Sequence, residues 1–145
     1  SIVRTIILYG CTDEMSRSNV VLWAKEALEK GEPINVVDDQ FRSPTWVDDL
    51  ADGCIKIAAQ NALGIYHLSG QETMSILELV FKVGEFFKLD TSMINPIKSN
   101  ALGQAAKRPP RTGFDISKAI NQLGYKPTSF NKGLELLSKQ IELKK

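Results

Sequence analysis

The chain has 145 residues, 43% of them hydrophobic and 24% charged, and a formal net charge of +1. This length allows one domain with a substantial core, and scattered, nearly balanced charges provide no broad field for nucleic acid or for an anionic membrane. Two isolated cysteines show no metal-binding or disulfide spacing, and no apolar run is long enough to span a bilayer. We therefore expect a cytoplasmic globular protein without a bound metal.

The first predicted element is the β-branched apolar run "IVRTIILY" at residues 2–9. Such a run is typical of a strand that is buried on both faces of a parallel sheet. A natural protein seldom begins inside a strand, so we expect this chain to be part of a longer polypeptide.

A helix follows over about residues 16–30 and stops at Gly31, and a short strand is predicted at Ile34–Val37. The next helix is predicted over about residues 46–60. Its apolar residues recur every three or four positions and form one stripe: Val47, Leu50, Ala51, Cys54, Ile55 and Ala58.

Three aspartates occur near the start of this helix, and we considered a metal site there. Thr45 and Asp48 have the spacing of a capping box, and Asp48 and Asp49 stand where the helix dipole favours negative charge. A metal site would need further ligands, and the only histidine, His67, lies in a predicted strand. The capping interpretation is favoured.

The remaining elements are bounded by clear turn and cap signals. The stretch "GIYHLSG" at residues 64–70 predicts a short strand, and Ser75 with Glu78 is a capping box that opens a third helix. Residues 94–97 suit only an edge strand because they include a proline. Residues 98–113 read as an irregular segment, followed by a short helix at 117–123 and a last helix capped by Ser129.

Alternating strands and helices predict an α/β arrangement, with parallel pairing between residues 2–9 and 64–70. Two strands do not make a buried parallel sheet, so we expect the missing neighbours upstream of Ser1.

Four segments, taken together and in order, resemble a known family: "IVRTIILYG", "DDQFRSPTWVDDLA", "GIYHLSGQETMSILELV" and "RPPRTGFDISKAINQLGYKP". They are similar to the second half of the extended short-chain dehydrogenase/reductases, and most of all to the dTDP-4-dehydrorhamnose reductase branch. The resemblance implies that residues 1–145 are the C-terminal, substrate-binding part of a Rossmann-type enzyme. The two parallel strands would complete a nucleotide-binding sheet whose other strands lie outside this chain.

The family implies an NAD(P)H-dependent reduction of a 4-keto sugar nucleotide in dTDP-rhamnose biosynthesis. NADPH or NADH would be bound mainly by an N-terminal domain. This chain holds neither a Gly-rich cofactor loop nor a Tyr-x-x-x-Lys pair, because Tyr9, Tyr66 and Tyr125 are followed four residues later by Asp13, Gly70 and Ser129. We therefore assign it no catalytic residue and expect the chain alone to be inactive.

The expected site combines three segments. Gln40, Arg42 and Thr45 would meet the sugar nucleotide from a turn, and Arg108 and Arg111 would meet it from the irregular segment. Tyr9 and Gly10 end the first strand, where open α/β sheets place their ligands, and would face the nicotinamide. A homo-oligomer is left open.

One departure from the family pattern bears on function. The reductases typically have a glycine where this sequence has Arg42. The region around Pro44–Thr45 and "RPPRTGFDISK" also resembles the regulatory subunit of methionine adenosyltransferase, which is not an enzyme. A non-catalytic regulatory module on the same fold is therefore the second hypothesis. An uncommitted α/β interaction domain ranks last, because it leaves the four ordered segments unexplained.

Overall fold

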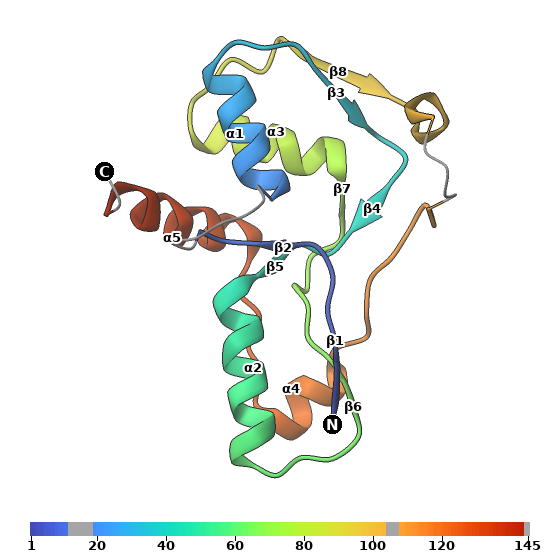
Figure 1. Ribbon diagram of the computed structural model, residues 1–145, viewed down its shortest axis with the longest axis vertical. Coiled ribbons are helices and arrows are strands. Elements are labelled where there is room, and N and C mark those ends of the chain that lie inside the picture. Colours follow the sequence, from blue (N-terminus) through green and yellow to red (C-terminus); the bar gives the residue numbers. More distant parts are fainter. Residues whose placement is uncertain (12–18, 104–107, 144–145) are drawn as a thin grey trace. The chain divides into compact units, whose positions relative to one another are not determined.

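The computed structural model describes residues 1–11, 19–103 and 108–143 of the chain (Figure 1). The chain folds into two compact units, and each unit combines segments that are far apart in the sequence. Unit 1 contains Ser1–Asp13, Ser43–Thr73 and Gly113–Lys145, and unit 2 contains Glu14–Arg42 and Met74–Thr112.

Unit 1 contains two pairs of parallel strands and three helices. The elements are β1 (Ile2–Arg4), β2 (Leu8–Tyr9), β5 (Thr45–Trp46), β6 (Ile65–His67), α2 (Val47–Ala59), α4 (Ser117–Leu123) and α5 (Phe130–Glu142). Strand β1 runs beside β6, with Ile2 opposite Ile65, and β2 runs beside β5 (Figure 1). The first pair confirms the parallel pairing predicted for residues 2–9 and 64–70.

The prediction of one uninterrupted strand over residues 2–9 is wrong. Ile7 has a φ of +40°, a conformation that β-branched residues rarely adopt, and this bend separates β1 from β2. Each strand then pairs with a different partner. The run is also not buried on both faces within this chain, since Ile2 exposes 57% and Leu8 exposes 37% of its surface.

The core of unit 1 lies between α2, α4 and β6. Its buried members are Ile57, Tyr66, Leu68, Ile116, Ala119, Leu123 and Tyr125. The close approach of α2 to the chain after β6 depends on Gly53, because a methyl group there would stand only 2.5 Å from the Leu68 side chain. A second cluster forms where the Tyr9 ring contacts Trp46 and Phe130, with ring centroids 5.4 Å and 5.3 Å away.

Two predictions for α2 are wrong in detail. Thr45 does not cap the helix, because it is a residue of β5 and no side chain caps the helix at Trp46. The predicted stripe is not the buried face either: α2 buries Gly53 and Ile57, while Ile55 is 66% exposed. Ala51, Cys54 and Ala58 are exposed as well. The buried face of α2 is the one on which Gly53 permits close packing. A pattern of apolar residues cannot reveal that face, because glycine is not counted as apolar.

Unit 2 contains two helices that pack side by side and two further strand pairs. Its elements are α1 (Val20–Glu29), β3 (Ile34–Val37), β4 (Phe41–Arg42), β7 (Met74–Ser75), α3 (Ile76–Phe86), β8 (Ile94–Ile97) and the 3₁₀ turn η1 (Ser99–Leu102). Strands β3 and β8 are parallel, and β4 and β7 are antiparallel (Figure 1). Among the described residues, β8 pairs with β3 alone, which confirms the edge position predicted from its proline.

Local cap chemistry explains where α1, α3 and α5 begin and where α1 ends. The Asn19 side chain accepts from the N–H groups of Val21 and Leu22 at the start of α1; residues 16–18, where the helix was predicted to begin, lie outside the described residues. Gly31 follows α1 with a φ of +66°. Ser75 caps α3 as predicted, accepting from the N–H of Glu78 at 3.0 Å. Ser129 caps α5 in the same way.

Candidate functional site: an arginine cluster beside β4

In unit 2, residues 110–112 run alongside β4 without forming a strand of their own. The N–H of Phe41 donates to the carbonyl oxygen of Pro110 at 2.7 Å, and the N–H of Thr112 donates to the carbonyl oxygen of Phe41 at 3.1 Å. Phe41 and Arg111 form a parallel bridge. On its other edge, β4 pairs with β7, placing Arg42 opposite Met74. The segment predicted to be irregular is therefore held against β4 at its last residues.

This pairing places Arg111 beside Phe41, the residue next to Arg42, and the three arginines that were expected to meet the sugar nucleotide therefore lie on the same part of unit 2. The Arg42 guanidinium donates to the carbonyl oxygen of Pro110, which follows Arg108 by two residues. The guanidinium carbon of Arg111 lies 5.3 Å from the centre of the Phe41 ring. Arg108 is exposed and near enough to Arg42 to affect its titration. Gln40, also nominated, is buried and accepts from Arg42 at 3.1 Å.

The cluster carries uncompensated positive charge. Every ion pair among the described residues uses a lysine, so no carboxylate described in the structure neutralises Arg42, Arg108 or Arg111. The pKa of Arg42 is lowered, first by burial and then by the positive charge of Arg108. An anion bound here would relieve this repulsion, and a guanidinium can meet phosphate oxygens with two parallel hydrogen bonds.

Thr45, which was also expected to contact substrate, is fully buried in unit 1. Its hydroxyl lies 2.8 Å from the carbonyl oxygen of Ile6 and 3.2 Å from that of Ser43, and it accepts from the N–H of Gly70 at 3.2 Å. These contacts use the hydrogen-bonding capacity of the hydroxyl inside the unit. We therefore leave Thr45 out of the site proposed below.

Tyr9 and Gly10 were expected to face the nicotinamide. The Tyr9 side chain exposes 1% of its surface and points into the aromatic cluster with Trp46 and Phe130. A methyl group at Gly133 of α5 would overlap the Tyr9 hydroxyl. The Tyr9 side chain therefore does not fit a cofactor contact, and a contact through the main chain at Tyr9–Gly10 stays a prediction.

Two groups in the arginine cluster were missed by the sequence analysis. The Phe41 ring supports Arg111, and the Pro110 carbonyl accepts from both β4 and the Arg42 side chain. Phe41 could have been suspected from its place between Gln40 and Arg42. The main-chain pairing between Phe41 and Pro110, 69 positions apart, could not be predicted from the local sequence pattern.

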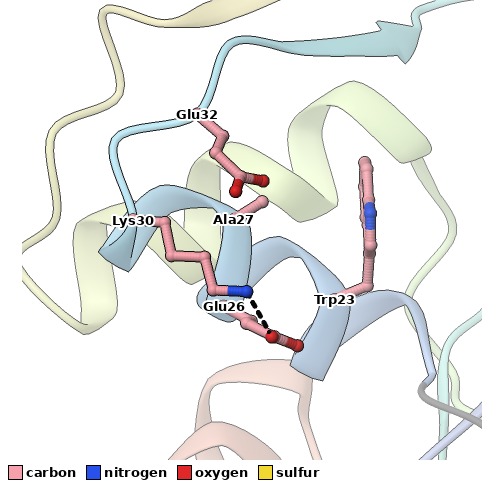
Figure 2. Close-up of a pocket in the computed structure, with 5 residues that line it drawn as sticks. All are labelled: Trp23, Glu26, Ala27, Lys30 and Glu32. Atoms are coloured by element: carbon pink, nitrogen blue, oxygen red, sulfur yellow. Dashed lines mark hydrogen bonds and ion pairs between the residues drawn. The ribbon is translucent and has the colours of Figure 1, made fainter.

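The remaining candidate features of the described residues carry no site. Five residues line a hollow of about 350 Å³, including its open mouth: Trp23, Glu26, Ala27, Lys30 and Glu32. Figure 2 shows how these side chains lie. Its Lys30 and Glu26 already pair with each other at 2.7 Å. No group of three or more potential metal ligands occurs among the described residues. No helix in the described part of the chain has the length and apolar character needed to cross a membrane.

Comparison with known proteins identifies the family. The RmlD substrate binding domain family matches residues 1–143. Among curated proteins, the chain is 30% identical over 123 residues to methionine adenosyltransferase 2 subunit beta of Xenopus tropicalis, which covers 81% of this chain and 36% of that protein. It is 29% identical over 134 residues to the spore coat polysaccharide biosynthesis protein SpsK of Bacillus subtilis, covering 92% of this chain and 45% of that protein.

Solved structures show the same fold. The dTDP-4-dehydrorhamnose reductase from Bacillus anthracis, in complex with NADP, superposes with a TM-score of 0.84 at 29% identity, over 96% of this chain and 48% of that one. The UDP-glucuronic acid 4-epimerase from Bacillus cereus has a TM-score of 0.76 at 24% identity, over 99% of this chain and 45% of that one, which shows the fold alone. The chain spans less than half the length of each of these four proteins. Because the family match runs over nearly the whole sequence, this chain belongs to the RmlD substrate binding domain family and has the α/β fold of the extended short-chain dehydrogenases/reductases.

Proposed function

We propose that residues 1–145 are the substrate-binding part of an NAD(P)H-dependent sugar-nucleotide reductase, most like the dTDP-4-dehydrorhamnose reductases. The cofactor would be bound mainly outside this chain and would supply the hydride that reduces a 4-keto sugar. The role of this chain is to hold the nucleotide diphosphate. The observation that carries the proposal is the cluster of Arg42, Arg108 and Arg111 beside β4, which has no carboxylate partner among the described residues.

The geometry suits a diphosphate in two respects. Arg108 and Arg111 flank Pro109–Pro110, whose fixed φ angles reduce the conformational entropy that is lost when a ligand orders this segment. The pairing of residues 110–112 with β4 fixes the same segment from one side. A preorganised pair of guanidinium groups favours a ligand with two adjacent negative charges over a ligand with one.

Titration of this chain with thymidine diphosphate, thymidine monophosphate and thymidine tests the proposal. We expect the diphosphate to bind more tightly than the monophosphate and thymidine not to bind measurably. Arg111→Lys and Arg108→Lys should each raise the Kd for the diphosphate about tenfold, equivalent to about 1.4 kcal/mol, because an ammonium cannot form the paired hydrogen bonds.

Arg4→Lys is the matched control, since Arg4 is an exposed residue of β1 in unit 1. It should leave both the Kd and the melting temperature unchanged. If Arg108→Lys and Arg111→Lys bind the diphosphate as tightly as the wild type, the diphosphate site lies elsewhere.

The second candidate is a regulatory module on the same fold. It is supported by the similarity to methionine adenosyltransferase 2 subunit beta, which covers 81% of this chain. Turnover decides between the two. A protein that carries this chain with its cofactor-binding part should reduce a dTDP-4-keto-6-deoxy sugar with NADPH or NADH, and binding without turnover would favour the regulatory module.

A further inference from the structure

Arg42 stands apart from the other two arginines because its guanidinium is already engaged in several hydrogen bonds. Nη1 donates to the carbonyl oxygen of Phe41 at 2.7 Å and to that of Pro110 at 3.3 Å, and Nη2 donates to Oε1 of Gln40 at 3.1 Å. Three of its five N–H donors are therefore used within unit 2. No hydrogen bond or ion pair of the Arg108 or Arg111 side chain occurs among the described residues, which leaves their donors free for a ligand.

Two of the three acceptors of Arg42 are main-chain carbonyls on the two sides of one backbone pairing, and the third is the side chain of Gln40, the residue before β4. The Phe41 carbonyl belongs to β4, and the Pro110 carbonyl belongs to the segment that pairs with it. We call the line of contact between β4 and residues 110–112 the seam. The Phe41 carbonyl also accepts from the N–H of Thr112 across the seam, and the Pro110 carbonyl also accepts from the N–H of Phe41. The Arg42 side chain thus crosses the seam between β4 and residues 110–112 and reinforces it with charge-assisted hydrogen bonds.

This arrangement has an electrostatic cost. Burial and the nearby Arg108 charge both lower the pKa of Arg42, so Arg42 and Arg108 hold like charges close together. A side chain placed there only to stabilise the strand pair would not need a positive charge. A positive charge at this position would stabilise an anion bound next to it. The hydrogen bonds of Arg42 fix the position of its guanidinium and therefore the position that favours the anion.

We propose that Arg42 is a positioning residue for the diphosphate site. It locks residues 110–112 against β4, so that Arg108 and Arg111 present their free donors to the same ligand, and it contributes hydrogen bonds to the protein rather than to the ligand. This inference rests on the function proposed above. It also accounts for a large cation at this position, because a glycine would leave the seam without its crossing side chain.

Two measurements on three variants separate this role from direct binding. Inorganic pyrophosphate is the probe, titrated calorimetrically, and amide hydrogen exchange of Phe41 and Thr112 reports on the seam, because both amides donate across it. Arg42→Lys keeps the charge but cannot span three acceptors. We expect it to speed exchange of both amides about tenfold and to raise the Kd about fivefold or more.

Arg108→Lys is the matched comparison. It should raise the Kd about tenfold and leave the exchange of Phe41 and Thr112 unchanged. Far-ultraviolet circular dichroism and a thermal melt check that both variants keep the fold. Arg42→Met, which loses the charge as well, should speed exchange to the same degree as Arg42→Lys.

Three outcomes would overturn the inference. Unchanged exchange in Arg42→Lys would show that Arg42 does not hold the seam. Faster exchange with unchanged affinity for pyrophosphate would show that the seam does not determine how Arg108 and Arg111 are positioned for the ligand. Failure of the wild type to bind pyrophosphate would remove the site itself, and with it the proposed function, while the exchange measurement would still report separately on the seam.

Discussion

Tyr9 and Tyr125 are buried to the same degree, each exposing 1% of its surface, but their hydroxyl groups differ in what they contact. The Tyr125 hydroxyl donates to the carbonyl oxygen of Ser69 at 3.2 Å. The Tyr9 hydroxyl has no hydrogen-bond partner among the described residues. Because a buried, unpaired hydroxyl is unfavourable, two chemically identical substitutions should have opposite consequences here.

Tyr125→Phe should destabilise the chain by about 1 kcal/mol, since it leaves the buried Ser69 carbonyl without a donor. Tyr9→Phe should leave the free energy of unfolding unchanged or raise it by up to about 1 kcal/mol, because it removes an unpaired polar atom from the core. Urea unfolding of both variants measures the difference. A larger loss for Tyr9→Phe than for Tyr125→Phe would show that the Tyr9 hydroxyl has a partner after all.

High pH provides a control with the same variants. Burial raises the pKa of both tyrosines, and nearby carboxylates raise it further. These carboxylates are Asp49 and Glu72 for Tyr9, and Asp49 and Asp52 for Tyr125. The folded state therefore keeps these protons to a higher pH than the unfolded state does. The contribution of each tyrosine proton to the free energy of unfolding is therefore fully present below about pH 10. Above that pH the free energy of unfolding falls by about 1.4 kcal/mol per pH unit for each tyrosine, so each phenylalanine variant should show a smaller decrease.

At the scale of elements, the start of α5 is tied to two other parts of unit 1. Asp49 of α2 accepts from the N–H of Thr128 at 2.7 Å and from its hydroxyl at 2.8 Å. Glu72 accepts from the N–H of Phe130 at 2.8 Å. One carboxylate of the aspartate group that begins α2 therefore holds the segment that leads into α5, in addition to standing in the first turn of its own helix.

Asp49→Asn should lower the free energy of unfolding by about 1–2 kcal/mol, because the amide keeps one acceptor oxygen and loses the charge that strengthens both bonds. Asp48→Asn is the matched control: Asp48 stands in the same helical turn, is exposed, and makes no hydrogen bond or ion pair with α5 among the described residues. It should cost no more than about 0.5 kcal/mol. Equal losses for the two variants would mean that the helix dipole, and not the Thr128 contact, explains the effect.

Elements whose ends depend on neighbouring residues were predictable. Gly31, Ser75 and Gly124 act through contacts within a few positions, so the sequence indicates them directly. The orientation of α2 was not predictable in this way. It depends on Gly53 meeting Leu68, a contact between residues that stand on either side of the turn between α2 and β6 and that no local pattern indicates.

The candidate site shows the same division. Arginine chemistry and the family resemblance were sufficient to nominate Arg108 and Arg111 as contacts to the sugar nucleotide. The burial of Thr45 and the engagement of Arg42 were not predictable, because their partners lie up to 68 positions away in the chain. The bend at Ile7 also gave no signal, since a β-branched apolar residue ordinarily favours an extended strand.

At the scale of the whole molecule, unit 1 leaves apolar strand surface uncovered. Ile2 and Ile65 are directly paired across β1 and β6, and they expose 57% and 43% of their surface. Strand β1 pairs only with β6, which leaves its other edge unpaired in the described structure. Parallel strands are normally covered on both faces, and an open edge favours pairing with another chain.

We therefore expect this chain to self-associate. Sedimentation velocity over a wide concentration range should show a weight-average coefficient that rises with concentration, and Ile65→Lys should weaken the association by placing a charge on the exposed face. Lys88→Ala, in exposed surface of unit 2, serves as a control and should behave as the wild type. A single monomeric species at all concentrations would contradict the expectation of further strands.

The division of the sequence between the two units also sets the order in which they can be completed during synthesis. All segments of unit 2 have been made once Thr112 is added, whereas unit 1 still lacks Gly113–Lys145 at that point. That last segment supplies Tyr125, Phe130 and Leu134 to the unit 1 core. Unit 1 therefore keeps its first strands without a finished core until residues 113–145 have been made, which makes it the unit more exposed to misfolding on the ribosome.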